Sequence, residues 1–472
     1  MTDPTAHRTA RRPTPLYTRV VSGASSAAGV SLSEVLGALS YALDLTEGQP
    51  PGHTVRSCLI GMRIADSLDL SPADRSALYY ALLLKDAGCS SNAARMAAVF
   101  GADDRFIKPR MKVVDWHDRL RLAVNTARNA GAGRSIFARV RHFVAVARTK
   151  NLTRDLIAVR CDRGAGIARR LGFPEATASA IQSLDEHWCG LGYAEGLAGD
   201  SIPLLARICN IAQTVDAFLA SGGPDAALRV VRRRRGTWFD PQLAAIVLSW
   251  RKDSTWWRTI RRDDAAALVL TAEPADHVER ADDARLDEVA LAFADIIDAK
   301  SPYTYRHSAR VAGYARAIAG ALGIDETEQR RIYRAGLLHD VGKLGVSSRI
   351  LDKNGSLTPE EWAEVRRHPD NTFAILSRVT AFASFAWTAA IHHEKLDGSG
   401  YSWGLEGSRI DQSARLLAVA DIYDALTSDR PYRPGLSPAD AVRILEKDAG
   451  TKLCARSIDA VRELTRAGEW RV

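Results

Sequence analysis

The segment AGLLHDVGKLGV at residues 335–346 decides the fold, because it sets a His-Asp pair directly after an apolar helical stretch. His339 and Asp340 are followed by Lys343, three residues further along the chain and about one helical turn away. Imidazole nitrogens and carboxylate oxygens bind divalent transition metals, and an ammonium group attracts phosphate. A His-Asp pair alone is a weak signal, so the rest of the chain has to supply further ligands.

Those ligands are present, because five of the eleven histidines lie after residue 300, each beside residues typical of metal sites. They are His307, His339, His368, His392 and His393, and Asp421 is a further candidate carboxylate. All five histidines fit the pattern of metal ligands, which favours a metal centre over isolated core or surface histidines. An Asp can bridge two metals about 3.5–4 Å apart, which together hold phosphate oxygens and generate a hydroxide near neutral pH.

The apolar residues recur at helical spacing almost throughout, as in ARVAGYARAIAGAL at 309–322, and alternating stretches are scarce. Pro72, Pro359 and Pro438 each follow Ser or Thr, which predicts a helix N-cap with Pro at the first helical position. We therefore predict an all-α fold without a substantial sheet.

The chain also repeats itself, which predicts two tandem helical domains. An offset of 254 aligns LSEV at 32–35 with LDEV at 286–289 and LLKD at 83–86 with LLHD at 337–340; further on, an offset of 208 aligns GLGY at 190–193 with GSGY at 398–401. The difference (254 − 208) implies 46 extra residues in the first copy, which we place around 100–146. The predicted boundaries are a disordered basic tail at 1–30, a first copy at 31–261, a loosely held acidic linker at 262–284 and a second copy at 285–472.

The second copy resembles the HD-GYP family of HD-domain metal-dependent phosphohydrolases over about residues 286–465. The matching segments are YTYRHSARVAGYA at 303–315, AGLLHDVGKLGV at 335–346, RRHPD at 366–370, IHHEKLDGSGYSWGL at 391–405 and ADIYDALTSDRPYR at 420–433. The resemblance implies a phosphodiesterase that hydrolyses cyclic di-GMP through a hydroxide bridging two metals, usually iron or manganese. The family's last signature residue is Pro, where this chain has Ser402, which leaves substrate detail open.

Matched by position, the resemblance also implies a role for each residue. His307, His339, Asp340 and Asp421 would surround one metal, and Asp340 would bridge to a second metal held by His368, His392 and His393. Asp340 and Lys343 would be catalytic, and Lys343, Tyr401, Arg430 and Arg433 would contact substrate. Members with a third metal carry a Glu where this chain has Tyr303, so two metals are expected.

The first copy looks degenerate at the same positions. His53 and Asp86 survive, but the remaining ligands are replaced, by Lys85, Arg160, Leu184, Asp185 and Gln213. Cations in place of imidazoles predict a catalytically dead HD-like domain whose basic groups offset the charge of Asp86. Regulation, dimerisation and scaffolding all remain open as its role.

Net charge, cysteine content and the length of apolar runs limit what can be expected of location and partners. The net charge is +8, the six cysteines form no CxxC pair, and no apolar run reaches the roughly 18 residues needed to cross a bilayer. We expect a cytoplasmic enzyme with a cyclic dinucleotide substrate, without nucleic-acid or membrane partners, and leave a homodimer open. Two alternatives stay open: a cyclic-nucleotide sensor with little turnover, and an HD phosphohydrolase acting on another nucleotide.

Overall fold

The protein is built almost entirely of helices. The computed structural model describes residues 30–115, 152–193, 195–262, 265–275, 279–429 and 434–470, with isolated positions between 116 and 151. Within these ranges the only sheet is a pair of two-residue antiparallel strands, β1 (Val30–Ser31) and β2 (Arg280–Ala281). This confirms the predicted all-α fold. No helix in the described ranges is long and apolar enough to cross a membrane.

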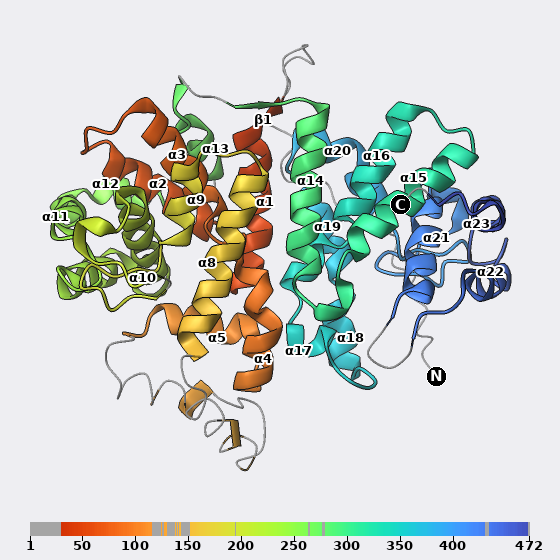
Figure 1. Ribbon diagram of the computed structural model, residues 1–472, viewed down its shortest axis with the longest axis horizontal. Helices are drawn as coiled ribbons and strands as arrows, with labels where there is room; N and C mark the ends of the chain where they lie inside the picture. Colours follow the sequence, from red (N-terminus) through yellow and green to blue (C-terminus); the bar gives the residue numbers. More distant parts are fainter. Residues whose placement is uncertain are drawn as a thin grey trace, which may run out of the picture.

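The helices fall into two groups along the chain (Figure 1). The first group contains α1 (Leu32–Glu47), α2 (His53–Ala65), α3 (Pro72–Leu84), α4 (Ala93–Phe100), α5 (Asp104–Lys112), α8 (Leu152–Arg170), α9 (Glu175–Gln182), α10 (Leu204–Arg234), α11 (Pro241–Ser249) and α12 (Ser254–Thr259). The second group contains α14 (Asp283–Asp298), α15 (His307–Ala321), α16 (Glu326–Leu338), α17 (Ser348–Leu351), α18 (Pro359–Val365), α19 (His368–Leu376), α20 (Ala383–Ala390), α21 (Gln412–Thr427), α22 (Pro438–Glu446) and α23 (Ala455–Ala467). Short 3-10 turns connect them, including η1 (Cys89–Asn92) and η6 (Val341–Gly345).

The bounds of the helices repeat with the offsets found in the sequence. An offset of 254 carries both ends of α3 onto both ends of α16, and an offset of 208 carries both ends of α9 onto both ends of α20. An offset of 254 also carries α18 onto residues 105–111, inside α5. We therefore propose that the extra residues of the first copy follow Lys112, later than the sequence alone suggested.

The two groups of helices share one continuous apolar core. In Figure 1, α1 and α14 both run through the middle of the molecule, and α1 packs against η6 and α19. Polar contacts reinforce this junction: the buried Lys300 ammonium lies 2.9 Å from the Asp104 carboxylate, which also accepts the Ser348 backbone N–H at 3.0 Å. The first copy therefore touches the segment directly after η6.

The expectation of a loosely held linker is wrong for the described residues 265–275. Helix α13 (Ala265–Thr271) packs against α1 and α2, and Val269 is buried. The Tyr79 hydroxyl donates to the Val269 carbonyl at 3.0 Å, and Glu273 accepts from the Tyr80 hydroxyl at 2.7 Å. The apolar residues of this segment pack against the surface formed by α1 and α2 of the first copy. Composition alone does not reveal such a contact.

Candidate metal centre

The centre lies where five segments of the second copy meet. His307 is the first residue of α15, His339 directly follows α16, and Asp340 precedes η6. His368 begins α19, the pair His392 and His393 follows α20, and Asp421 lies within α21. The metal-binding atoms form two groups, Asp340 with His368, His392 and His393, and His307 with His339 and Asp421. Residues 114 positions apart in sequence (421 − 307) thus meet in one place.

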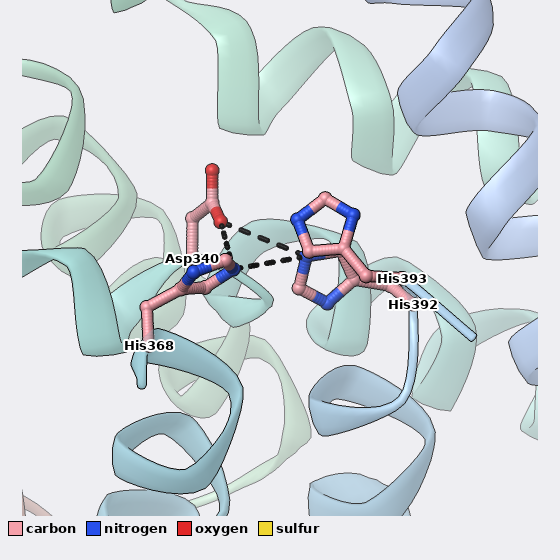
Figure 2. Close-up of side chains that lie close together, drawn as sticks. All are labelled: Asp340, His368, His392 and His393. Atoms are coloured by element: carbon pink, nitrogen blue, oxygen red, sulfur yellow. Dashed lines mark hydrogen bonds and ion pairs between the residues drawn. The ribbon is translucent and has the colours of Figure 1, made fainter. Parts of the chain in front are cut away.

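Asp340 lies between the two groups, and its two carboxylate oxygens face opposite ways. Its Oδ2 atom lies 3.6 Å from His307 Nε2 and 3.4 Å from His339 Nε2. Its Oδ1 atom lies 3.4 Å from His368 Nε2 and 3.7 Å from His392 Nε2. Figure 2 shows Asp340 and the three histidines of its own group pointing toward one another. This is the orientation that a carboxylate bridging two cations requires.

Hydrogen bonds behind the rings fix which nitrogen of each imidazole faces the centre. His339, His368 and His392 each donate their Nδ1 proton to the backbone carbonyl three residues earlier, at 2.7–2.8 Å. Because a neutral imidazole carries one proton, the Nε2 atoms of His368 and His392 then present lone pairs. The Nε2 atoms of His368 and His392 lie only 3.4 Å apart. Two facing lone pairs repel each other unless a cation lies between them, so the local geometry fits a metal.

Burial and charge support the same assignment. Burial lowers the pKa of His368 and of His392 to about 3, so both stay neutral and able to bind a metal at pH 7. Burial opposes ionisation of Asp340, but His339 and Lys343 outweigh it and hold its pKa well below its usual value. His339 Nε2 and Asp340 Oδ1 are buried and have no hydrogen-bond partner among the described residues. Such orphaned polar atoms are costly in a protein without a ligand to satisfy them.

The predicted substrate contacts are placed only in part. The Lys343 ammonium lies 2.6 Å from Asp340 Oδ2, at the more exposed side of the centre. The Tyr401 ring stacks on His393 with ring centres 4.6 Å apart, and the Arg366 guanidinium lies 5.4 Å from the centre of the Tyr401 ring. Arg430 and Arg433 lie outside the described residues, so their role stays a prediction.

Sequence reasoning did not single out Asp424, which orients His307 from behind. Its Oδ2 atom lies 2.7 Å from His307 Nδ1, and its carboxylate also accepts from the Arg310 guanidinium. Asp424 lies three residues after Asp421 on α21 and therefore on nearly the same helix face. The first copy repeats the arrangement, with Asp216 bound to His53 and Arg56. That repeated Asp was the signal that could have found it.

Asp424→Asn should weaken metal binding by 10–100-fold without abolishing it, because partners behind a metal-bound histidine contribute about that much. The amide no longer holds the Nδ1 proton of His307 as a carboxylate does. Metal titration of the full chain measures the effect, and Asp440→Asn serves as the control, since Asp440 is a partly exposed carboxylate of α22 that pairs with Arg443. Unchanged metal affinity would show that Asp424 does not orient a ligand.

In the first copy, basic side chains occupy the corresponding place. The Lys85 ammonium lies 3.2 Å from His53 Nε2 and pairs with Asp86. Arg160 pairs with Asp185, the two residues that stand where His368 and His393 stand in the second copy. Gln213, in place of Asp421, donates to Asp185 at 3.3 Å. Ion pairs thus replace the arrangement of facing imidazoles.

One further group in the first copy, Glu47, Asp86 and Cys89, brings potential metal-binding atoms within 4.8 Å of one another. The Lys112 ammonium lies among them, 2.8 Å from Glu47 and 3.5 Å from Asp86. Since Lys112 pairs with Glu47 and Lys85 pairs with Asp86, these ammonium groups compete with a metal ion for the same carboxylates. We therefore keep the proposal that the first copy binds no metal pair.

An all-α, duplicated scaffold with buried imidazoles around a His-Asp pair defines an HD-domain phosphohydrolase. A family model described as "HD domain" matches residues 142–243 and 292–456, so it reaches into both copies. The chain belongs to this family, in its HD-GYP branch, with a degenerate HD-like first copy. It is a metal-dependent phosphohydrolase.

Individual proteins similar to this chain are phosphodiesterases of cyclic dinucleotides. The chain is 41% identical over 434 residues to 3'3'-cGAMP-specific phosphodiesterase 3 of Vibrio cholerae, covering 92% of this chain and 94% of that protein. The crystal structure of a cyclic GMP-AMP-specific phosphodiesterase from V. cholerae matches with a TM-score of 0.65 and 37% identity, covering 93% of this chain and 98% of that one. A cyclic di-GMP phosphodiesterase of Pseudomonas aeruginosa is 39% identical over 200 residues, which is 42% of this chain and 46% of that protein.

Proposed function

We propose that this enzyme cleaves a phosphodiester bond of a cyclic dinucleotide and that its preferred substrate is 3'3'-cGAMP. The observation that carries the preference is the extent of the similarity. The 3'3'-cGAMP-specific relative matches 92% of the chain, including the degenerate first copy, whereas the cyclic di-GMP phosphodiesterase matches 42%. Cyclic di-GMP, the substrate expected from the second copy alone, is therefore the second candidate.

We propose that the chain divides into a first copy at 31–261 and a second copy at 285–472, and that only the second copy carries the catalytic metal centre. In the second copy, Asp340 would bridge two cations held by the other ligands described above, with iron or manganese the proposed metals. Two such cations supply Lewis acidity toward the phosphate oxygens and lower the pKa of water. The chain itself orients the imidazoles through Gly336, Val365, Ala389 and Asp424, and the Tyr401 ring stacks on His393.

The substrate proposal is tested by comparing turnover of 3'3'-cGAMP and cyclic di-GMP by the full, manganese-loaded chain. A value of kcat/KM at least tenfold higher for 3'3'-cGAMP supports the proposal, and linear dinucleotide or mononucleotides should appear as products. The reverse ratio would favour cyclic di-GMP. Tight binding of both nucleotides without any product would instead favour the sensor alternative.

Lys343→Ala should lower kcat by about 10²-fold while metal content stays at the wild-type level, because a donor to the reacting phosphate is removed. Lys353→Ala is the matched control, since Lys353 is a partly exposed lysine that pairs with Glu361 instead. Turnover and metal content are measured on the same preparations. If the two variants have equal rates, the assignment of Lys343 to the phosphate is wrong.

A further inference from the structure

A cavity of about 80 Å³ lies in the first copy, between α5, α8 and α10. Its walls are mostly apolar, with Met96, Phe100 and Leu156 on one side, and five charged side chains reach into it. Lys112 is 13% exposed, so the cavity approaches solvent at this residue. An engineered cavity of ~150 Å³ holds a benzene ring. The smaller space here fits a compact oxyanion and excludes a whole cyclic dinucleotide.

The cavity occupies the place that the metal centre has in the second copy. Arg160, Asp185 and Gln213 line it, and an offset of 208 carries them onto His368, His393 and Asp421. Lys112 also lines it, and an offset of 254 carries it onto Arg366, the residue over the Tyr401 ring. The duplicated scaffold thus keeps a hollow at the position of the metal centre, where the Arg160 guanidinium stands in place of an imidazole and Lys112 stands in place of Arg366.

The charges that line the hollow leave an excess of one positive charge. Lys108, Lys112 and Arg160 carry three positive charges, and Glu47 and Asp185 carry two negative ones. Lys85 and Asp86, just behind this wall, pair with each other. A buried cation without its own counter-charge is unfavourable, so an anion held in the cavity would offset this positive charge.

One hydrogen-bond donor of Arg160 is left unpaired, which suggests that a ligand binds there. Its residue is more than nine-tenths buried, and its NH2 group pairs with Asp185. Its Nε atom is buried and has no hydrogen-bond partner among the described residues. The unpaired Nε–H can donate to one phosphate oxygen, and the planar donors of a guanidinium match the oxygens of phosphate. The Lys112 ammonium, with three donors, lines the same cavity.

We propose that the first copy binds a phosphate group in this cavity, through Arg160 and Lys112. The phosphate comes either from inorganic phosphate or from a phosphate monoester, such as a mononucleotide whose remainder lies toward Lys112 and solvent. The site is separate from the metal centre, so it stands whether the substrate is 3'3'-cGAMP or cyclic di-GMP.

The test is calorimetric titration of the metal-free full chain carrying Asp340→Asn, with inorganic phosphate and with GMP as separate probes. One equivalent should bind, and adding Arg160→Met should weaken binding at least tenfold. Asp185→Asn should tighten it severalfold, because it removes the carboxylate that competes for Arg160. Tighter binding cannot result from misfolding. Arg169→Met is the matched control, an exposed arginine on the same helix that pairs with Glu175 and should leave binding unchanged.

The two probes separate the sources of the phosphate: tighter binding of GMP identifies a monoester, and binding of inorganic phosphate alone identifies the free ion. The proposal is overturned if neither probe binds, or if Arg160→Met binds as tightly as the parent, which would place the anion in the second copy. It is equally overturned if Asp185→Asn weakens binding.

Discussion

Asp340→Asn is expected to lower kcat by at least about 10³-fold and to deplete bound metal, the largest effect of any single substitution in this chain. The two oxygens of Asp340 face different groups of imidazoles, at 3.4 Å from His339 and 3.4 Å from His368. An amide offers one oxygen and no negative charge, so it cannot neutralise two cations. Turnover and metal content of the full chain measure the effect together.

Asp397→Asn is the matched control for this experiment, because the Asp397 carboxylate is exposed and caps a turn through Ser399. It should retain turnover and metal. If Asp340→Asn kept activity near that of the control, Asp340 would not bridge and a different carboxylate would have to be sought.

Removal of metal by a chelator is expected to abolish turnover and to lower the melting temperature of the chain. A ligand that binds only the folded state at 100 times its Kd adds about 2.7 kcal/mol of stability, which a chelator takes away. Without a cation, the imidazole lone pairs of His368 and His392 face and repel each other. They also repel the buried carboxylate of Asp340. Manganese or ferrous ion should restore both turnover and melting temperature.

The same experiment on Asp340→Asn serves as its control. That variant should melt at one temperature with and without chelator, because it holds little metal. A chelator that left wild-type turnover intact would contradict a metal-dependent mechanism. A chelator shift of equal size in both proteins would locate the stabilising metal elsewhere in the chain.

The amino-acid sequence by itself determined the helical fold class and the chemistry of the second copy. Apolar residues at helical spacing and Ser-Pro or Thr-Pro starts predict helices locally, since these signals act over a few residues. The repeat of LSEV and LLKD as LDEV and LLHD revealed the two copies, and the replacement of His339 by Lys85 showed which one had lost its ligands. Residue type and position were sufficient for each of these inferences.

The tertiary structure decided how the side chains are aimed and how the copies are joined. The sequence implied the bridging place of Asp340 only through the family resemblance. It could not show that the two oxygens of Asp340 face different imidazoles, or that the segment around Val269 packs against the first copy. It also could not place Asp104 against Lys300 and Ser348, or reveal the cavity beside Arg160. These features depend on contacts between residues far apart along the chain, which arise only when apolar faces pack together. Local periodicity carries no information about such distances.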